Sequence, residues 1–256
     1  MANSKSWEKI CKDYKILDHD FSKMPFPISA AQIKLSCQKF KETGAKEVRI
    51  LCSQAHRESR PAVFVKNNLF LLPVKNGFYN IIKGEGYVDL PIIEKEFTVY
   101  PSKLDFPLDT SNVGDSEMQH LDYAYAVSLI RTFTEDPSLV LTIRGRKYTP
   151  EFDFYVGKQL IKVSSVQTEV DAGYEGKNKI VLIEAKNFNA PNVIIRQLYY
   201  PYRQWQSQTK KKVTTLFFDK KKSENIYSIW QFEFEDPQNY NSIMLVKSGR
   251  FKVQEK

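Results

Sequence analysis

The chain has 256 residues, of which 42% are apolar, 27% are charged and 22 are Gly or Pro (10 plus 12), a composition that excludes disordered, collagen-like and coiled-coil proteins. Its length allows one large or two smaller domains, each with its own hydrophobic core. The excess of 38 Lys and Arg over 30 Asp and Glu gives a net charge of +8, which favours a polyanionic partner such as nucleic acid or an acidic membrane surface.

The first hundred residues are predicted to form a helix followed by short strands. Apolar residues recur at helical spacing from Ser29, a suitable N-cap, to Gly44, a suitable stop. Four apolar runs then predict strands, and Asn76-Gly77 marks a hairpin turn between the last two. These strands are Glu47–Cys52, Ala62–Val65, Leu69–Val74 and Phe78–Ile82. The order favours an N-terminal α+β domain, either winged-helix-like or of a more generic kind.

A linker is predicted between Thr98 and Asp115, because this stretch is rich in Pro, Asp, Ser and Gly and has no sustained periodicity. We place the domain boundary near residue 110. The N-terminal domain, residues 1–110, is then an accessory or DNA-recognition unit, and residues 111–256 form the second domain.

The second domain is predicted to contain a mixed sheet with helices packed on it. One helix runs from Met118 to Phe133, with Asp115 or Ser116 as N-cap. A later helix begins after Asn189 or Asn192 and is interrupted at Pro201. The predicted strands are Leu139–Ile143, Phe152–Val156, Leu160–Val163, Val166–Asp171, Ile180–Lys186, Val213–Phe218, Tyr227–Phe234 and Ser242–Val246. The fold class is α/β (α+β), with a mixed central β-sheet flanked by helices.

Several functional classes have no support in the sequence. Cys11, Cys37 and Cys52 show no C-x-x-C spacing, which argues against a disulfide framework or a zinc ribbon and for a reducing cytoplasm. The N-terminus lacks the apolar core of a secretion signal, and no run of apolar residues is long enough to span a membrane. Nucleic acid is therefore the favoured partner, with no membrane expected. Motifs for acyl transfer, nucleotide hydrolysis and dinucleotide binding are absent.

Charged side chains follow two predicted neighbouring strands. Alternation puts Gln167, Glu169 and Asp171 on one face of the first strand. The second strand opens with four apolar residues and ends with Glu184 and Lys186 on one face. Carboxylate oxygens suit Mg²⁺, and an ammonium can hold a water beside a phosphate. We therefore predict that Asp171, Glu184 and Lys186 form one catalytic site, although a surface ion pair at a strand end is the ordinary interpretation of Glu-x-Lys alone.

These residues resemble the motif of the PD-(D/E)xK nuclease superfamily, to which most type II restriction endonucleases belong. Asp171 is followed 13 positions later by Glu184-Ala185-Lys186, although Val170 replaces the signature proline. The resemblance implies a restriction-endonuclease-like core and Mg²⁺-dependent, sequence-specific hydrolysis of double-stranded DNA that leaves 5′-phosphate ends. It also implies Asp171 and Glu184 as metal ligands, a homodimer, a cognate DNA methyltransferase as functional partner, and a bacterial or archaeal cytoplasm.

Further candidates surround this motif. Glu169 and Glu117 are candidate additional metal ligands. Glu169 could instead only form hydrogen bonds beside the site, and Glu117 could instead be an acid that the helix dipole favours in a first helical turn. Asp153 is a rival for the first acid. DNA contacts are expected from a basic segment predicted at a glycine turn and from two polar residues downstream of the motif; these are Arg144, Arg146, Lys147, Arg196 and Gln197.

Two other functions remain open from the sequence. One is a PD-(D/E)xK nuclease for DNA repair or end processing, which cuts without strict site choice. The other is a non-catalytic DNA-binding regulator, in which the acids pair only with neighbouring Lys and Arg. Discrete bands from a digested plasmid distinguish restriction from repair, and binding without cutting under any metal indicates the regulator.

Overall fold

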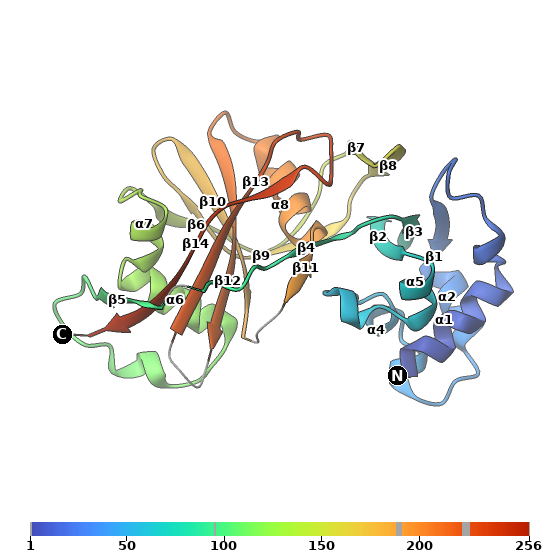
Figure 1. Cartoon of the computed structure of the whole chain (residues 1–256), viewed down its shortest axis with the longest axis horizontal. Coiled ribbons are helices and arrows are strands. Elements are labelled where there is room, and N and C mark those ends of the chain that lie inside the picture. The colour runs from blue at the N-terminus through green and yellow to red at the C-terminus, as the bar shows by residue number, and fades with distance from the viewer. Residues whose placement is uncertain (1, 95, 188–190, 222–225, 256) are drawn as a thin grey trace.

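The computed structural model describes residues 2–94, 96–187, 191–221 and 226–255 (Figure 1). Residues 2–83, here called the N-terminal module, combine short helices with a three-stranded antiparallel sheet of order β1-β3-β2. The strands are β1 (Phe26–Ser29), β2 (Leu69–Lys75) and β3 (Phe78–Lys83). The helices are α1 (Ala2–Asp13), α2 (Ala30–Cys37), α3 (Thr43–Lys46), α4 (Val48–Leu51) and α5 (Ala62–Lys66), with 3-10 turns η1 (Ile16–Asp18) and η2 (Arg57–Ser59).

The N-terminal module is held together by its own hydrophobic cluster, in which Trp7, Ile33 and Phe64 are fully buried. The indole Nε1 of Trp7 donates a hydrogen bond to the carbonyl of Leu51 over 3.0 Å, so the aromatic side chain leaves no polar group unpaired. At the start of α2, Ser29 accepts from the backbone of Gln32 while the Gln32 side chain accepts from the backbone of Ser29. This capping box confirms the predicted N-cap.

Two predicted strands of this module are wrong. The strand predicted over residues 47–52 is instead the helix α4, Val48–Leu51, with Leu51 buried in the hydrophobic cluster. Residues 62–65 lie in α5, which follows Pro61 and buries Phe64. Both segments are short and apolar, and such runs do not distinguish a strand from one or two helical turns. The predicted helix from Ser29 ends at Cys37, before Gly44, and α1 was not predicted.

Residues 84–255, here called the C-terminal module, contain a seven-stranded mixed sheet of order β5-β14-β13-β12-β10-β9-β6. Its strands are β5 (Thr98–Pro101), β6 (Val140–Tyr148), β9 (Gln167–Glu175), β10 (Lys179–Lys186), β12 (Lys212–Lys221), β13 (Ile226–Phe234) and β14 (Ile243–Gln254). Two small antiparallel pairs accompany it. They are β4 (Tyr87–Asp89) with β11 (Asn192–Ile194), and β7 (Phe152–Val156) with β8 (Gln159–Val163).

Helices cover both faces of the large sheet. The helices α6 (Glu117–Ala126) and α7 (Leu129–Phe133) share one hydrophobic cluster with residues of one sheet face, such as Ile183 and Leu216. The helix α8 (Arg196–Gln206) packs on the opposite face through Leu198 and Tyr199. Because α8 connects β10 to the parallel strand β12, its first turn lies beside the carboxyl end of β10. The expected mixed sheet flanked by helices is confirmed.

Several predicted boundaries in this module are corrected. The helix expected over 118–133 is divided at Ser128, whose φ of 65° breaks it into α6 and α7; Ser116 is the N-cap. Asn192 does not cap a helix but lies in β11, whereas Asn189 is outside the described residues. Pro201 does not interrupt α8, because packing on the sheet holds the helix together. The last strand is longer than expected and reaches Gln254.

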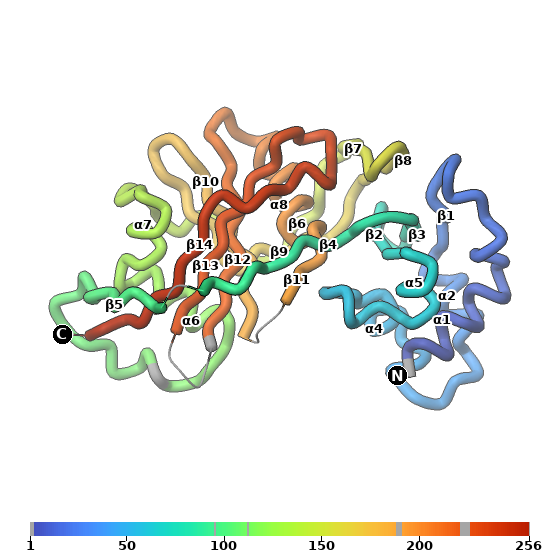
Figure 2. The backbone as a smooth tube through the Cα atoms, in the orientation of Figure 1, coloured from blue at the N-terminus to red at the C-terminus, as the bar shows by residue number. Residues whose placement is uncertain are grey.

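The segment expected to be a linker contributes to the C-terminal module. From the end of β3 the chain runs along the large sheet to its far edge, where β5 pairs in parallel with β14 (Figure 2). A 3-10 turn, η3 (Asp109–Asn112), follows before α6. Residues on both sides of position 110 therefore belong to one layered structure. No described helix has the length and apolar character needed to cross a membrane.

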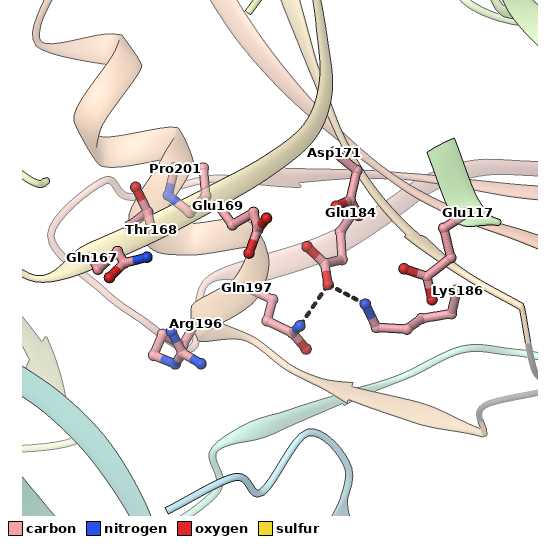
Figure 3. Close-up of a pocket in the computed structure, with 10 residues that line it drawn as sticks. All are labelled: Glu117, Gln167, Thr168, Glu169, Asp171, Glu184, Lys186, Arg196, Gln197 and Pro201. Carbon is pink, nitrogen blue, oxygen red and sulfur yellow. Dashed lines mark hydrogen bonds and ion pairs between the residues drawn. The ribbon is translucent and has the colours of Figure 1, made fainter. Parts of the chain in front are cut away.

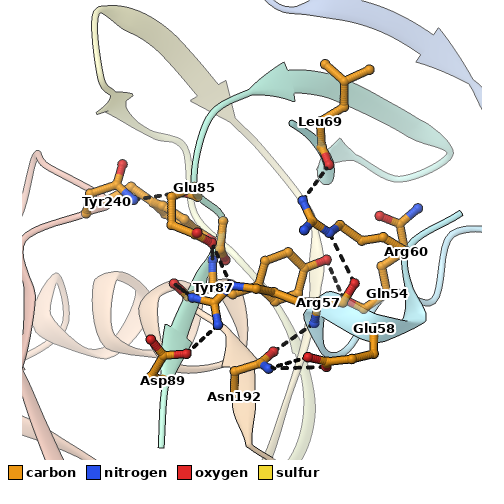
Figure 4. Close-up of polar contacts among 12 residues, drawn as sticks. Gln54, Arg57, Glu58, Arg60, Leu69, Glu85, Tyr87, Asp89, Asn192 and Tyr240 are labelled. Carbon is orange, nitrogen blue, oxygen red and sulfur yellow. Dashed lines mark hydrogen bonds and ion pairs between the residues drawn. The ribbon is translucent and has the colours of Figure 1, made fainter. Parts of the chain in front are cut away.

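Polar contacts fix the two modules against each other (Figure 4). Asn192, which is buried in β11, accepts a hydrogen bond from the backbone N–H of Arg57 over 2.7 Å. Its amide nitrogen donates to the carboxylate of Glu58 over 3.1 and 3.2 Å. The Arg57 guanidinium pairs with Asp89 in β4, and the Tyr87 hydroxyl donates to the carbonyl of Gln54. We call this set the junction; it orients the N-terminal module toward the start of α8.

Candidate active site

The candidate site forms where strands β9 and β10 stop pairing. Their ladder ends at the pair Ala172 and Ile183. Asp171 comes one residue before Ala172 in β9, and its side chain takes the place of a backbone partner for β10. Its Oδ2 accepts a hydrogen bond over 2.8 Å from the N–H of Ala185, two residues beyond Ile183. The first acid is therefore held by the second strand itself, where the pairing of the two strands ends.

Glu184 and Lys186 lie on the same face of β10, as period two requires. The Lys186 Nζ is 2.6 Å from Oε1 of Glu184. Gln197, in the first turn of α8, donates its Nε2 to the same oxygen over 2.5 Å. Figure 3 shows both contacts converging on the Glu184 carboxylate, with Asp171 beside it. The parallel crossover from β10 to β12 thus supplies a positioning residue for the acid.

These groups line one pocket of about 400 Å³. The wall consists almost entirely of polar and charged side chains, which suits an ionic ligand better than an apolar one. It is formed by Glu117, Gln167, Thr168, Glu169, Asp171, Glu184, Lys186, Arg196, Gln197 and Pro201. Asp171, Glu184 and Lys186, which were predicted to form one site, therefore line the same cavity.

Burial sets the protonation behaviour of the site. Desolvation raises the pKa of Glu184 to about 7, despite the opposing attraction of Lys186. Burial also raises the pKa of Asp171, against the hydrogen bond from Ala185. For Lys186, burial is outweighed by Glu184 and the other acids nearby, so the pKa of the amine is raised and the ammonium is retained. Near neutral pH, Glu184 is thus poised between its two protonation states.

The two further acids lie on opposite sides of this group. Glu117 opens α6 behind the Ser116 cap, and Figure 3 places its carboxylate next to Lys186. Burial raises the pKa of Glu117. Glu169 lines the pocket from β9, but its side chain is more than half exposed and forms an ion pair with Arg146. Of the two acids, Glu117 is the less exposed to solvent.

The five residues that were expected to contact DNA lie in two different places in the structure. Arg196 and Gln197 line the pocket from the start of α8. Arg144, Arg146 and Lys147 lie within strand β6 rather than at a turn, with Gly145 at φ 84° where the β6–β9 register shifts. Arg144 forms an ion pair with Asp122 of α6. None of these three cations is among the pocket-lining residues of the described chain.

Asp153 does not reach the site: it is exposed in β7, in the separate two-stranded sheet. Sequence reasoning missed Thr168 and Pro201 as lining residues. Thr168 is buried and donates to Gln204 of α8 over 2.7 Å, a contact that only the tertiary packing of β9 against α8 creates. Pro201 reaches the pocket because α8 continues through it, which the sequence argues against.

The donor set suits a hard divalent cation. Asp171 and Glu184 offer carboxylate oxygens, and the Oε1 atom of Gln197 is buried without a hydrogen-bond partner in the described structure. Such an oxygen can contact an ion or accept a hydrogen bond from a water molecule bound to the ion. Across the described ranges, no three His, Cys, Asp or Glu side chains are already grouped closely enough to count as a metal site. The acids present fit Mg²⁺ only with water or phosphate oxygens completing the coordination.

The fold and the pocket define a two-module α+β protein whose larger module carries two acids and a lysine at the open end of adjoining strands. The chain belongs to the family described as "Domain of unknown function (DUF6997)", whose model matches residues 82–252. A second model, "Domain of unknown function (DUF6996)", matches residues 4–81. No curated protein and no solved structure matches the chain.

Proposed function

We propose that this protein is a Mg²⁺-dependent endonuclease that hydrolyses phosphodiesters of double-stranded DNA at specific sequences, as type II restriction endonucleases of the PD-(D/E)xK superfamily do. The observation that carries the proposal is the shared pocket of Asp171, Glu184 and Lys186, three side chains whose order and spacing follow the superfamily motif. The net charge of +8 adds support, since a duplex is a polyanion.

Each residue of the pocket has a role in this chemistry. Asp171 and Glu184 would hold the metal, which when bound neutralises phosphate charge and lowers the pKa of water. Lys186 would orient the attacking water and stabilise the negative charge that develops on the phosphate. Gln197 keeps the Glu184 carboxylate in place. The Ala185 N–H does the same for Asp171.

The architecture is compatible with this assignment. We infer that the large sheet is a restriction-endonuclease-like core, with the acids on the antiparallel pair β9 and β10 and with α8 leading to the parallel strand β12. We also infer that the N-terminal module is winged-helix-like, because helices precede a β2–β3 hairpin in a sheet of order β1-β3-β2. Its task would be to contact the DNA.

Cutting both strands of a duplex requires two active pockets. A homodimer whose two-fold axis matches a palindromic target is the simplest arrangement that supplies them. A cognate DNA methyltransferase would protect the genome of the host. This enzyme is a functional partner of the proposed nuclease, with no physical contact implied.

The test is incubation of the purified chain with phage DNA and Mg²⁺, followed by sequencing of the ends. The proposal expects discrete fragments with 5′-phosphate ends, and no fragments from the Asp171→Ala variant. Cutting without site preference would instead indicate a repair or end-processing nuclease. DNA binding with no cutting in Mg²⁺ or Mn²⁺ would leave the regulator as the function.

A further inference from the structure

A second pocket, of about 540 Å³, lies between the two modules; we call it the basic pocket. From the N-terminal module it is lined by α4, by the turn between β2 and β3, and by Tyr79. From the C-terminal module it is lined by Val166 and Gln167 at the start of β9 and by Ile194 and Arg196. Each module supplies only part of the wall, so the pocket requires both.

The charge of the basic pocket is of one sign. Arg49, Lys75 and Arg196 line it, and among the residues that the structure describes no Asp or Glu does. In the described part of the chain, none of these three cations forms an ion pair, whereas several other surface cations do. Three unpaired cations around one cavity concentrate positive potential there, which favours an anionic ligand.

Each of these three cations lies on or next to an ordered element of secondary structure. Lys75 precedes the Asn76-Gly77 turn, where Gly77 adopts φ 76° and lets the hairpin close tightly. Arg49 is exposed on α4, whose Leu51 anchors the helix in the N-terminal cluster. Arg196 is the first residue of α8. The two sides of the pocket are thus built on anchored elements rather than on long loops.

Two hydrogen bonds also hold the two modules together next to the pocket. The hydroxyl of Tyr200 in α8 donates to the carbonyl of Pro73 in β2 over 2.9 Å. The N–H of Ile194 donates to the carbonyl of Ala55 over 2.9 Å. Together with the junction (Figure 4), these bonds keep Lys75 and Arg49 at a fixed position relative to Arg196. A ligand therefore meets a preformed site.

The basic pocket continues into the candidate active site. Gln167 and Arg196 line both cavities, so the two share a wall. The first cavity contains the acids Asp171 and Glu184, whereas the charged residues that line the second among the described residues are all cations. This polarity suits a polyanion that is bound along the basic side and reacts at the acidic side, where a metal would offset the charge.

We propose that the basic pocket binds the sugar-phosphate backbone of duplex DNA next to the phosphate that is cut, and that the N-terminal module takes part in substrate binding through Arg49 and Lys75. The inference rests on the proposed function for the identity of the reacting phosphate. The buried side-chain amide of Gln54 also lines the pocket and has no hydrogen-bond partner in the described structure, and its Nε2 is a donor that suits a phosphate oxygen.

The experiment measures binding separately from cutting. A fluorescein-labelled duplex of mixed sequence is titrated with the full chain in EDTA, at several salt concentrations, by anisotropy. The variants are Arg49→Ala, Lys75→Ala and the double variant; Lys12→Ala, an exposed cation on α1, is the matched control. Each lost phosphate contact reduces the slope of log K against log salt by about 0.9. The double variant should lose about two in slope and at least tenfold in affinity, with the Lys12→Ala slope unchanged.

The outcomes separate the two proposals. If the double variant matches the wild type in slope and affinity while the wild type cuts DNA in Mg²⁺, the basic pocket is not the binding site and the nuclease assignment survives. If the slope falls as expected but no metal supports cutting, the pocket binds DNA and the nuclease assignment fails. If the wild type binds no duplex at all, both fail. Equal thermal melting of variants and wild type shows that the effect is not unfolding.

Discussion

The Lys186 ammonium and the Glu184 carboxylate form a buried ion pair between residues that are two apart in one strand, with Nζ 2.6 Å from Oε1. The side chains retain only 17% and 9% of their exposure. Burying either charge alone is costly, so each depends on the other for its ionised state. The pair therefore couples the protonation of the acid to the presence of the amine.

Replacing Lys186 by Ala should abolish most of the proposed cutting activity. The variant removes the group that stabilises charge on the phosphate, and we expect the rate of plasmid linearisation to fall on the order of 100-fold or more. Lys177→Ala, which removes an exposed lysine at the β9–β10 turn, is the matched control and should cut at the wild-type rate. Wild-type cutting by Lys186→Ala would remove the amine from the mechanism.

Replacing Glu184 by Gln should remove a pH dependence of stability and stop metal-dependent cutting. The folded-state pKa of about 7 lies above the ordinary value of 4.5, so the folded protein binds this proton more tightly than the unfolded chain. The wild type is therefore most stable, relative to the variant, below about pH 4.5 and loses stability as the pH rises to 7. Between pH 5 and pH 8 the stability of the wild type relative to the variant should therefore fall by on the order of 2 kcal/mol.

Urea denaturation of the Glu184→Gln protein at pH 5 and pH 8 checks this dependence. The midpoint difference between variant and wild type should increase with pH. Glu235→Gln changes an exposed acid and should show no such trend. A difference that is the same at both pH values would mean that Glu184 is ionised throughout the range and that burial does not control its proton.

Replacing Gln197 by Ala should move the pH dependence of cutting. The variant loses the hydrogen bond to Oε1 of Glu184, which favours the charged carboxylate, so the pKa of Glu184 should rise. Cutting at pH 7 should drop about tenfold and recover toward pH 9, with Gln208→Ala, an exposed glutamine beyond the end of α8, as control. An equal loss at every pH would instead show that Gln197 acts on the substrate directly.

Replacing Asn192 by Ala should weaken the junction between the modules. The buried amide satisfies the Arg57 N–H and the Glu58 carboxylate, and its loss should lower the free energy of unfolding by about 2 kcal/mol. Chemical denaturation measures the change, and Asn178→Ala in an exposed turn is the control. Equal stability of Asn192→Ala and wild type would show that solvent replaces both contacts.

The sequence predicts which charged residues of the candidate site lie together better than it predicts the helices and strands around them. Asp171, Glu184 and Lys186 are recognisable because charge follows a strand that is apolar on both faces, and strand alternation then fixes their common side. Ser29 is predictable for a similar reason, since capping is a local interaction. These inferences need only neighbouring residues.

The errors arise where tertiary contacts decide the outcome. The apolar run around Val193 is buried on every side, and such a run reads equally as helix or strand until its pairing with Val88 is known. Pro201 remains in a helix because the sheet supports α8. The basic pocket is not predictable from local pattern at all, because Arg49, Lys75 and Arg196 come together only through the docking of two modules.

The pairing of β5 with β14 has a consequence for biosynthesis. Thr98 finds its partner at Phe251, about 150 positions later in the chain. A nascent polypeptide that has emerged from the ribosome only as far as β13 leaves the edge strand β5 without its partner. Assembly of the complete sheet is thus postponed until translation has passed β14, and a shortened translation product would retain the pocket residues on an unfinished scaffold.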